Sequence, residues 1–184
     1  MEKRNVAVAK AKGLGLSEII FIGILLAAGA VLKFFVGSMF TVVKPNFIIA
    51  MYCLAMLIIR PRLVEAAIIG LLSGVVCQLF PGTPYVNLVS EIVGAVCMYF
   101  LMKIPMNIGK FSLSPIVSTF ISTLASGFTF IGIVYLALYS GADVTPMPLQ
   151  LFCGIIFGTA SNNSVIVQIL YIPLSLAMKK GAAK

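Results

Sequence analysis

The sequence predicts an all-α integral membrane protein with six transmembrane helices, and three observations lead to this fold class. Hydrophobic residues make up 61% of the 184 residues and charged residues only 10%, whereas about a quarter of the residues in soluble domains are charged. The mean hydropathy is +1.13. Long apolar runs alternate with short segments rich in Pro, Gly and basic residues. Because one spanning helix takes about 20 residues, about six fit into a chain of this length.

Each helix is predicted from an apolar run and from the residues that bound it. The first run, residues 17–37, opens with Ser17, a residue type favoured at helix N-caps. The second run, residues 46–59, ends at the Arg60-Pro61 pair, because proline restricts the residue before it and arginine favours the membrane interface. The next three runs end at turn-forming or basic segments and comprise residues 63–80, 86–102 and 113–139.

The last apolar stretch, residues 149–178, is too long for one ordinary span. We expect it to divide into a short outer segment, residues 149–158, and a sixth helix, residues 159–178. The chain then has three parts in order. They are a cytoplasmic N-terminal segment (1–16), a six-helix membrane domain (17–178) and a basic cytoplasmic tail (179–184).

The basic residues favour this topology with both termini in the cytoplasm. Positively charged residues are enriched in cytoplasmic connections. With six crossings and an internal N-terminus, only Lys33 and Lys44 of the 13 basic residues fall on the outer side. Five or seven crossings would place the Lys179-Lys180 tail outside and spoil the partition. The net charge of +8 therefore reflects helix orientation, and the basic residues are too dispersed for nucleic acid binding.

Catalysis by the chain itself is not expected. It contains no His and only five acidic residues, which removes most of the side chains used for acid–base chemistry or metal binding. No P-loop motif is present, so ATP hydrolysis would need another chain. The four Cys lie in apolar stretches without paired spacing and are expected to be small buried residues. We predict a protein that is not an enzyme and has no metal or cofactor.

Polar and aromatic residues collect on the predicted outer side and suggest an outward-facing cup for a small ligand. Each of these polar residues can also be explained by a structural role without a ligand. Asn87 can cap a helix, Glu91 lies near a helix N-terminus where an acid is favoured, and Lys44 can reach lipid headgroups. Neighbouring helices can satisfy the two adjacent asparagines. The candidate ligand-binding residues are Lys44, Asn46, Tyr85, Asn87, Glu91, Asn162 and Asn163.

Small residues in the first helix form a second candidate surface. Gly23 and Ala27 are four residues apart, so they share one face and allow another helix to approach closely. Packing within the chain and docking of a separate membrane partner both remain open.

Several motifs resemble the substrate-binding S component of energy-coupling factor (ECF) transporters, with the tryptophan-transport branch as the most similar. Over residues 29–178, Lys44-Pro45-Asn46 resembles that branch's Lys-Pro-Asp, with Asn in place of Asp. Phe80-Pro81-Gly82, Pro84 and Asn87 resemble the Phe-Pro-Gly, Pro and Asn stretch of that branch, in a shorter loop. Asn163 and Tyr171 resemble its Asn and Tyr-Pro, with Ile172 inserted before Pro173.

The resemblance implies a multi-pass subunit of a prokaryotic plasma membrane that captures a nutrient from outside. Its partners would be a transmembrane coupling subunit and two ATP-binding cassette ATPases. Gly23 and Ala27 would dock the coupling subunit, with Gly in place of the commoner Ala at the first position. An aromatic compound such as tryptophan is the first expected substrate, and a vitamin such as cobalamin is the second. A solitary carrier or channel, and a membrane scaffold, are the alternatives from other functional classes.

Overall fold

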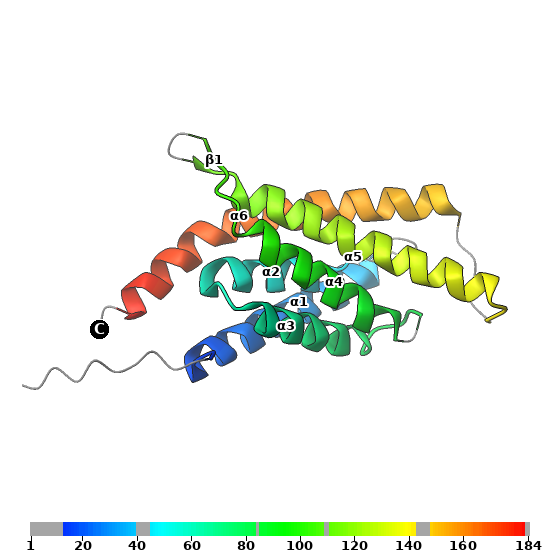
Figure 1. Ribbon diagram of the computed structural model, residues 1–184, viewed down its shortest axis with the longest axis horizontal. Helices are drawn as coiled ribbons and strands as arrows, with labels where there is room; N and C mark the ends of the chain where they lie inside the picture. The colour runs from blue at the N-terminus through cyan, green and yellow to red at the C-terminus, as the bar shows by residue number, and fades with distance from the viewer. Residues whose placement is uncertain (1–12, 40–44, 84, 109–110, 143–147, 183–184) are drawn as a thin grey trace, which may run out of the picture.

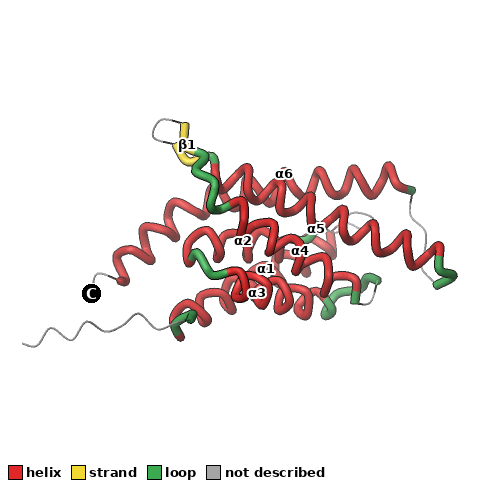
Figure 2. The backbone as a smooth tube through the Cα atoms, in the orientation of Figure 1, coloured by secondary structure: helices red, strands yellow, loops and turns green. Residues whose placement is uncertain are grey.

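The computed structural model describes residues 13–39, 45–83, 85–108, 111–142 and 148–182, which form a bundle of α-helices (Figures 1 and 2). The all-helical prediction is confirmed except for one small hairpin, in which β1 (Asn107–Ile108) pairs antiparallel with β2 (Phe111–Ser112). The helices are α1 (Leu16–Met39), α2 (Phe47–Ile59), α3 (Leu63–Cys77), α4 (Val86–Leu101), α5 (Ser114–Tyr139) and α6 (Leu149–Ala182).

The short helix α2 forms the centre of the bundle. Its 13 residues are apolar on every side, and all eleven from Phe47 to Leu57 are buried. A helix that is hydrophobic all round is expected in a core. α2 contacts each of the other five helices, and its side chains form the largest part of the hydrophobic core. The α2 helix therefore lies against all the other helices, while α3, α4, α5 and α6 also pack extensively against their neighbours in sequence.

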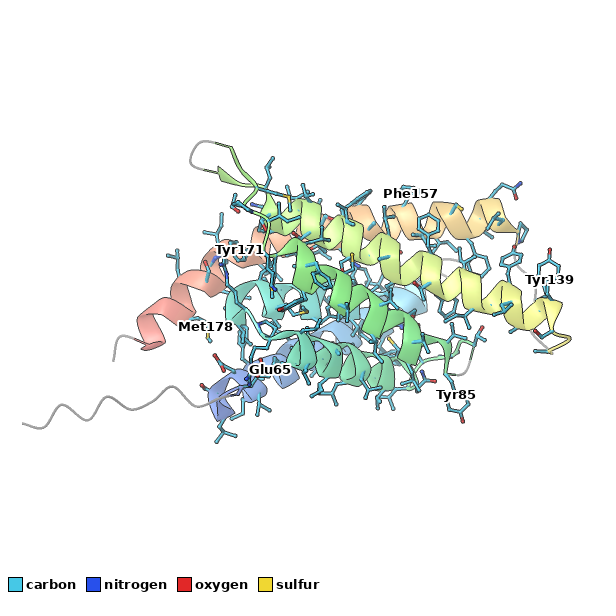
Figure 3. The ribbon with its side chains drawn as sticks, in the orientation of Figure 1. Glu65, Tyr85, Tyr139, Phe157, Tyr171 and Met178 are labelled. Carbon is cyan, nitrogen blue, oxygen red and sulfur yellow. The ribbon has the colours of Figure 1, made fainter. Side chains whose placement is uncertain are left out.

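The helices alternate in direction along the long axis of the bundle. The start of α1, the end of α6, the α2–α3 connection and the β1–β2 hairpin lie at one end, here called the termini end (Figure 1). The other end, here called the distal end, holds the last residues of α1, α3 and α5 and the first residues of α4 and α6, while the short helix α2 begins further inside the bundle. Glu65 and Met178 mark the termini end, and Tyr85 and Tyr139 mark the distal end (Figure 3).

Three helical segments are long and apolar enough to cross a membrane by length and composition: Leu16–Val36, Ser114–Tyr139 and Leu149–Met178. The chain is therefore compatible with a membrane protein. The helices α2, α3 and α4 have only 13, 15 and 16 residues, which corresponds to about 20 to 24 Å of helix.

The expected division of residues 149–178 is wrong, because α6 is a single helix of 34 residues. The Ser161 and Ser164 hydroxyls donate hydrogen bonds to the carbonyl oxygens of Phe157 and Ala160, four residues earlier. These polar side chains are thus satisfied within the helix and do not interrupt it. Pro173 lies inside α6, and the helix changes direction along its C-terminal half (Figure 1), as expected where proline removes a backbone hydrogen bond.

Helices α3 and α4 approach closely through two glycines of α3. A Cβ atom at Gly70 would lie 2.6 Å from the Glu91 carbonyl oxygen and 2.8 Å from the Ala95 Cβ. A Cβ atom at Gly74 would lie 2.8 Å from the Asn87 carbonyl oxygen. These glycines therefore set the position of the α4 backbone that carries Asn87 and Glu91.

We expect Gly70→Ala to lower the free energy of unfolding by about 1–3 kcal/mol, because the added methyl group overpacks the α3–α4 contact. Gly132→Ala is the matched control, since a Cβ atom there has no heavy atom within 4 Å. Thermal unfolding of both variants in detergent micelles measures the effect. Equal stability of the two variants would contradict the close α3–α4 approach.

Candidate functional site

A cavity of about 730 Å³ opens at the distal end of the bundle. This volume falls in the range of about 300–1,000 Å³ found for small-molecule sites. The walls come from α1, α4, α5, α6 and the α3–α4 connection, and Asn46 and Ile49 contribute the start of α2. The cavity exists because α2 begins only at Phe47, while α1, α5 and α6 are much longer helices.

The polar part of the cavity is a chain of three side chains. The Lys33 ammonium donates to the Asn46 side-chain oxygen at 3.4 Å. The Asn46 side-chain nitrogen in turn donates to Glu91 Oε1. The amide therefore bridges a cation on α1 and a carboxylate on α4. Because its side chain serves this bridge, Asn46 makes no side-chain capping bond at the start of α2.

Cys77, the last residue of α3, lies beside this bridge. Its Sγ is 3.5 Å from both the Lys33 Nζ and the Asn46 Nδ2. Cys77 is a free cysteine and is buried, as is Cys53, whereas Cys97 and Cys153 are half-buried, so the expectation of four buried cysteines is confirmed for only two of them. Its polar neighbours were not expected.

Glu91 is almost completely buried, with 1% of its surface exposed. Its Oε2 has no partner of good hydrogen-bond geometry among the described residues, and neither has the buried hydroxyl of the adjacent Ser90. The Tyr52 and Ser126 hydroxyls lie beside the Glu91 carboxylate. A buried carboxylate is costly unless it is paired and hydrogen-bonded. The site therefore holds an acceptor that a ligand with hydrogen-bond donors can satisfy.

The rest of the cavity wall is mainly apolar and aromatic. Phe34, Phe80, Phe130 and Phe152 contribute rings from four different segments. The Lys33 ammonium lies 4.9 Å from the centroid of the Phe80 ring, within the range of a cation–π interaction. A cavity with rings on several sides and few polar groups suits a largely apolar ligand with a small polar head.

A buried stripe of hydroxyl side chains on α5 completes the site. Ser122 donates to the Gly94 carbonyl oxygen at 2.8 Å and links α5 to α4, while Thr123 and Ser126 line the cavity. These positions were not among the candidates from sequence. The sequence pattern could have indicated them, because Ser and Thr occur at positions 118, 119, 122, 123 and 126. Residues spaced three and four apart lie on the same face of a helix.

The structure brings together three of the expected ligand-binding residues, because Asn46, Asn87 and Glu91 all line the cavity. Asn163 is fully buried behind the wall. Its side-chain nitrogen donates to the Asn46 backbone oxygen at 3.1 Å and to the Thr123 hydroxyl at 3.4 Å. Asn163 thus holds the start of α2 against α6 and α5.

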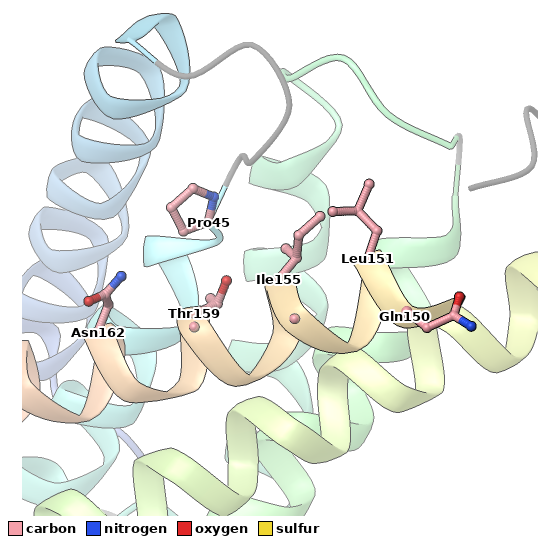
Figure 4. Close-up of a pocket in the computed structure, with 8 residues that line it drawn as sticks. Pro45, Gln150, Leu151, Ile155, Thr159 and Asn162 are labelled. Carbon is pink, nitrogen blue, oxygen red and sulfur yellow. The ribbon is translucent and has the colours of Figure 1, made fainter. Parts of the chain in front are cut away.

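The other expected residues do not line the main cavity. Tyr85 precedes α4 in a left-handed conformation (φ 61°), and its side chain is 73% exposed at the distal end (Figure 3). Asn162 is exposed and lines a smaller groove of about 220 Å³, between α6 and Pro45 (Figure 4). Lys44 lies outside the described residues. Lys33, which the sequence reasoning assigned only to the outer rim, is the charged cavity residue that was missed.

The expected docking residues lie on the outer surface of α1. Gly23 and Ala27 are both exposed, and a Cβ atom at Gly23 would have no heavy atom within 4 Å. No other described helix of the chain therefore packs closely against α1 at Gly23.

Within the described ranges, no three His, Cys, Asp or Glu side chains gather that could hold a metal ion. The chain was compared with protein-family models, with curated proteins and with solved structures, and none of them matches it.

Proposed function

We propose that the chain is the substrate-binding subunit of an ATP-driven nutrient importer of the ECF type. The observation that carries this proposal is the cavity at the distal end, with Lys33, Asn46 and Glu91 at its polar side and phenylalanine rings around it. A single open chamber of this size and lining is suited to holding one small molecule.

In this proposal six helices cross a prokaryotic plasma membrane, and the cavity faces outward. The charge distribution supports the orientation, because Arg60, Arg62 and Lys103 belong to the connections at the termini end. Basic residues near helix ends favour the cytoplasmic side. The helices α2, α3 and α4 are shorter than the membrane is thick. In this proposal the cavity and the connecting segments at the distal end occupy the rest of the membrane thickness.

The chain would deliver its ligand through partners that hydrolyse ATP. They are a transmembrane coupling subunit and two ATP-binding cassette ATPases, as the family resemblance implies. The exposed face of Gly23 and Ala27 supports this arrangement, because small residues let a partner helix come close in a membrane. An aromatic amino acid such as tryptophan is the first candidate substrate, and a vitamin such as cobalamin is the second. Mass spectrometry of small molecules that co-purify with the chain tests this choice directly.

Ala27→Leu is expected to abolish most ATP-dependent uptake in liposomes that contain the coupling subunit and the ATPases, because the larger side chain blocks helix docking. Ligand binding by the isolated chain, measured by calorimetry, should stay unchanged. Ala28→Leu is the matched control, since Ala28 is also an exposed alanine of α1 and points about 100° further round the helix. Uptake by the wild-type chain without ATPases would instead favour a solitary carrier.

Asn163→Leu is expected to weaken binding of the co-purified compound about tenfold, because it removes the side-chain donor that holds the Asn46 backbone oxygen and frees the start of α2. The Asn46 oxygen then keeps only the 3.3 Å bond from the Ile49 N–H within the first turn of α2. Asn162→Leu, the neighbouring amide outside the main cavity, should bind like the wild type. Calorimetry measures both affinities, and pull-down with the coupling subunit should show normal assembly for both variants. Stronger loss of binding in Asn162→Leu than in Asn163→Leu would place the ligand in the small groove of Figure 4.

A further inference from the structure

The main cavity presents two opposite charges and no others among its described lining residues, namely Lys33 and Glu91. The cavity lining is therefore close to neutral when both are ionised. If a bound ligand carried one net charge, the cavity with its ligand would carry that same net charge. An uncompensated charge in a mostly apolar cavity is unfavourable. The lining thus favours a ligand with no net charge that can still engage both groups.

The Asn46 side chain shows which hydrogen-bonding groups fit between the Lys33 ammonium and the Glu91 carboxylate. Its carbonyl oxygen accepts from the Lys33 ammonium, and its nitrogen donates to Glu91 Oε1. In the amide, the accepting oxygen and the donating nitrogen are attached to one carbon. In an α-amino acid, the accepting carboxylate and the donating ammonium are likewise attached to one carbon. The head group of an α-amino acid therefore offers the same order of acceptor and donor over a span that is longer by one bond, and with charges that strengthen both hydrogen bonds.

A second observation points to a donor-rich ligand at the carboxylate. Glu91 Oε2 is buried and has no partner of good hydrogen-bond geometry among the described residues, although the Tyr52 and Ser126 hydroxyls lie beside the carboxylate. The Asn46 nitrogen carries two protons and is engaged with Oε1 and with the Cys77 sulfur. An ammonium group carries three protons, so it can serve both oxygens of Glu91 at once.

We propose that Lys33 and Glu91 bind the carboxylate and the ammonium of a zwitterionic amino acid, whose head group takes the place of the Asn46 side chain. The apolar body of the ligand then lies among Phe80, Phe130 and Phe152. This inference rests on the proposed ligand-binding function and adds to it the residues and charges that select the ligand.

Three probes with the same ring system test the proposal on the full chain in detergent micelles. They are L-tryptophan, which is a zwitterion, tryptamine, which lacks the carboxylate, and indole-3-propionate, which lacks the ammonium. L-Tryptophan is expected to bind at least about tenfold more tightly than either analogue, because each analogue leaves one charged group unpaired. Equal binding of all three probes, or binding of none, would overturn the proposal.

Two variants make the test independent of folding. Lys33→Met should reverse the preference toward tryptamine, since Glu91 then has no cation beside it, and Glu91→Gln should reverse it toward indole-3-propionate. Lys103→Met and Glu65→Gln are the matched controls at the termini end and should keep the preference for L-tryptophan. A variant that binds a new probe more tightly cannot be explained by loss of fold. Unchanged preferences in both cavity variants would overturn the inference.

The outcome separates this inference from the proposed function. If another compound co-purifies and is imported with ATP while no probe binds, the importer function stands and the amino-acid ligand is wrong. If L-tryptophan binds with the expected preferences but no ATP-dependent uptake occurs, the ligand site stands and the importer function is wrong.

Discussion

The position of Asn46 at the start of α2 is the constraint on which the distal end of the bundle depends. The α2 helix is apolar on all sides and stays enclosed, so its first residues lie inside the protein and its neighbours continue past them. Asn46 then joins three helices, because its side chain contacts Lys33 of α1 and Glu91 of α4, and its backbone oxygen accepts from Asn163 of α6. An asparagine at this position ordinarily caps its own helix. Here its side chain instead links the polar residues of the cavity.

In the proposed importer, the charged groups Lys33 and Glu91 serve recognition of the ligand more than stability of the fold. A buried ion pair contributes little net stability, because desolvation offsets the attraction between the charges, and apolar residues of similar volume often serve as well. Here Lys33 and Glu91 are linked through the Asn46 amide and the Cys77 thiol, and one oxygen of Glu91 has no partner of good hydrogen-bond geometry among the described residues. Two other buried side-chain acceptors, Asn163 Oδ1 and Gln168 Oε1, also have no partner among the described residues, but of the three residues only Glu91 lines the cavity. An acceptor left open beside a chamber is suited to a ligand.

Much of the fold could be predicted from sequence because apolar runs and proline-containing breaks have local causes. The predicted starts of α3 and α4 agree with the structure, and that of α2 differs by one residue. The continuity of α6 could not be predicted from composition, since Ser and Asn favour loops in general but here bond within the helix or across to α2. Asn162 and Asn163 show the limit for the site. Neighbouring residues on a helix point about 100° apart, so only the packing of α6 decides which amide turns inward.

Helix α1 connects the two surfaces on which the proposed function depends. One face carries Lys33 into the cavity, and another exposes Gly23 and Ala27 to the outside. The helix is packed tightly on α2 at Gly29, where a Cβ atom would lie 2.9 Å from the Met51 Cγ and 3.0 Å from the Ile48 Cα. Such close contact opposes sliding of α1 along α2, because packed interiors yield little to local displacement. The close packing of α1 on α2 therefore fixes the cavity residue Lys33 and the exposed Gly23–Ala27 face relative to one another.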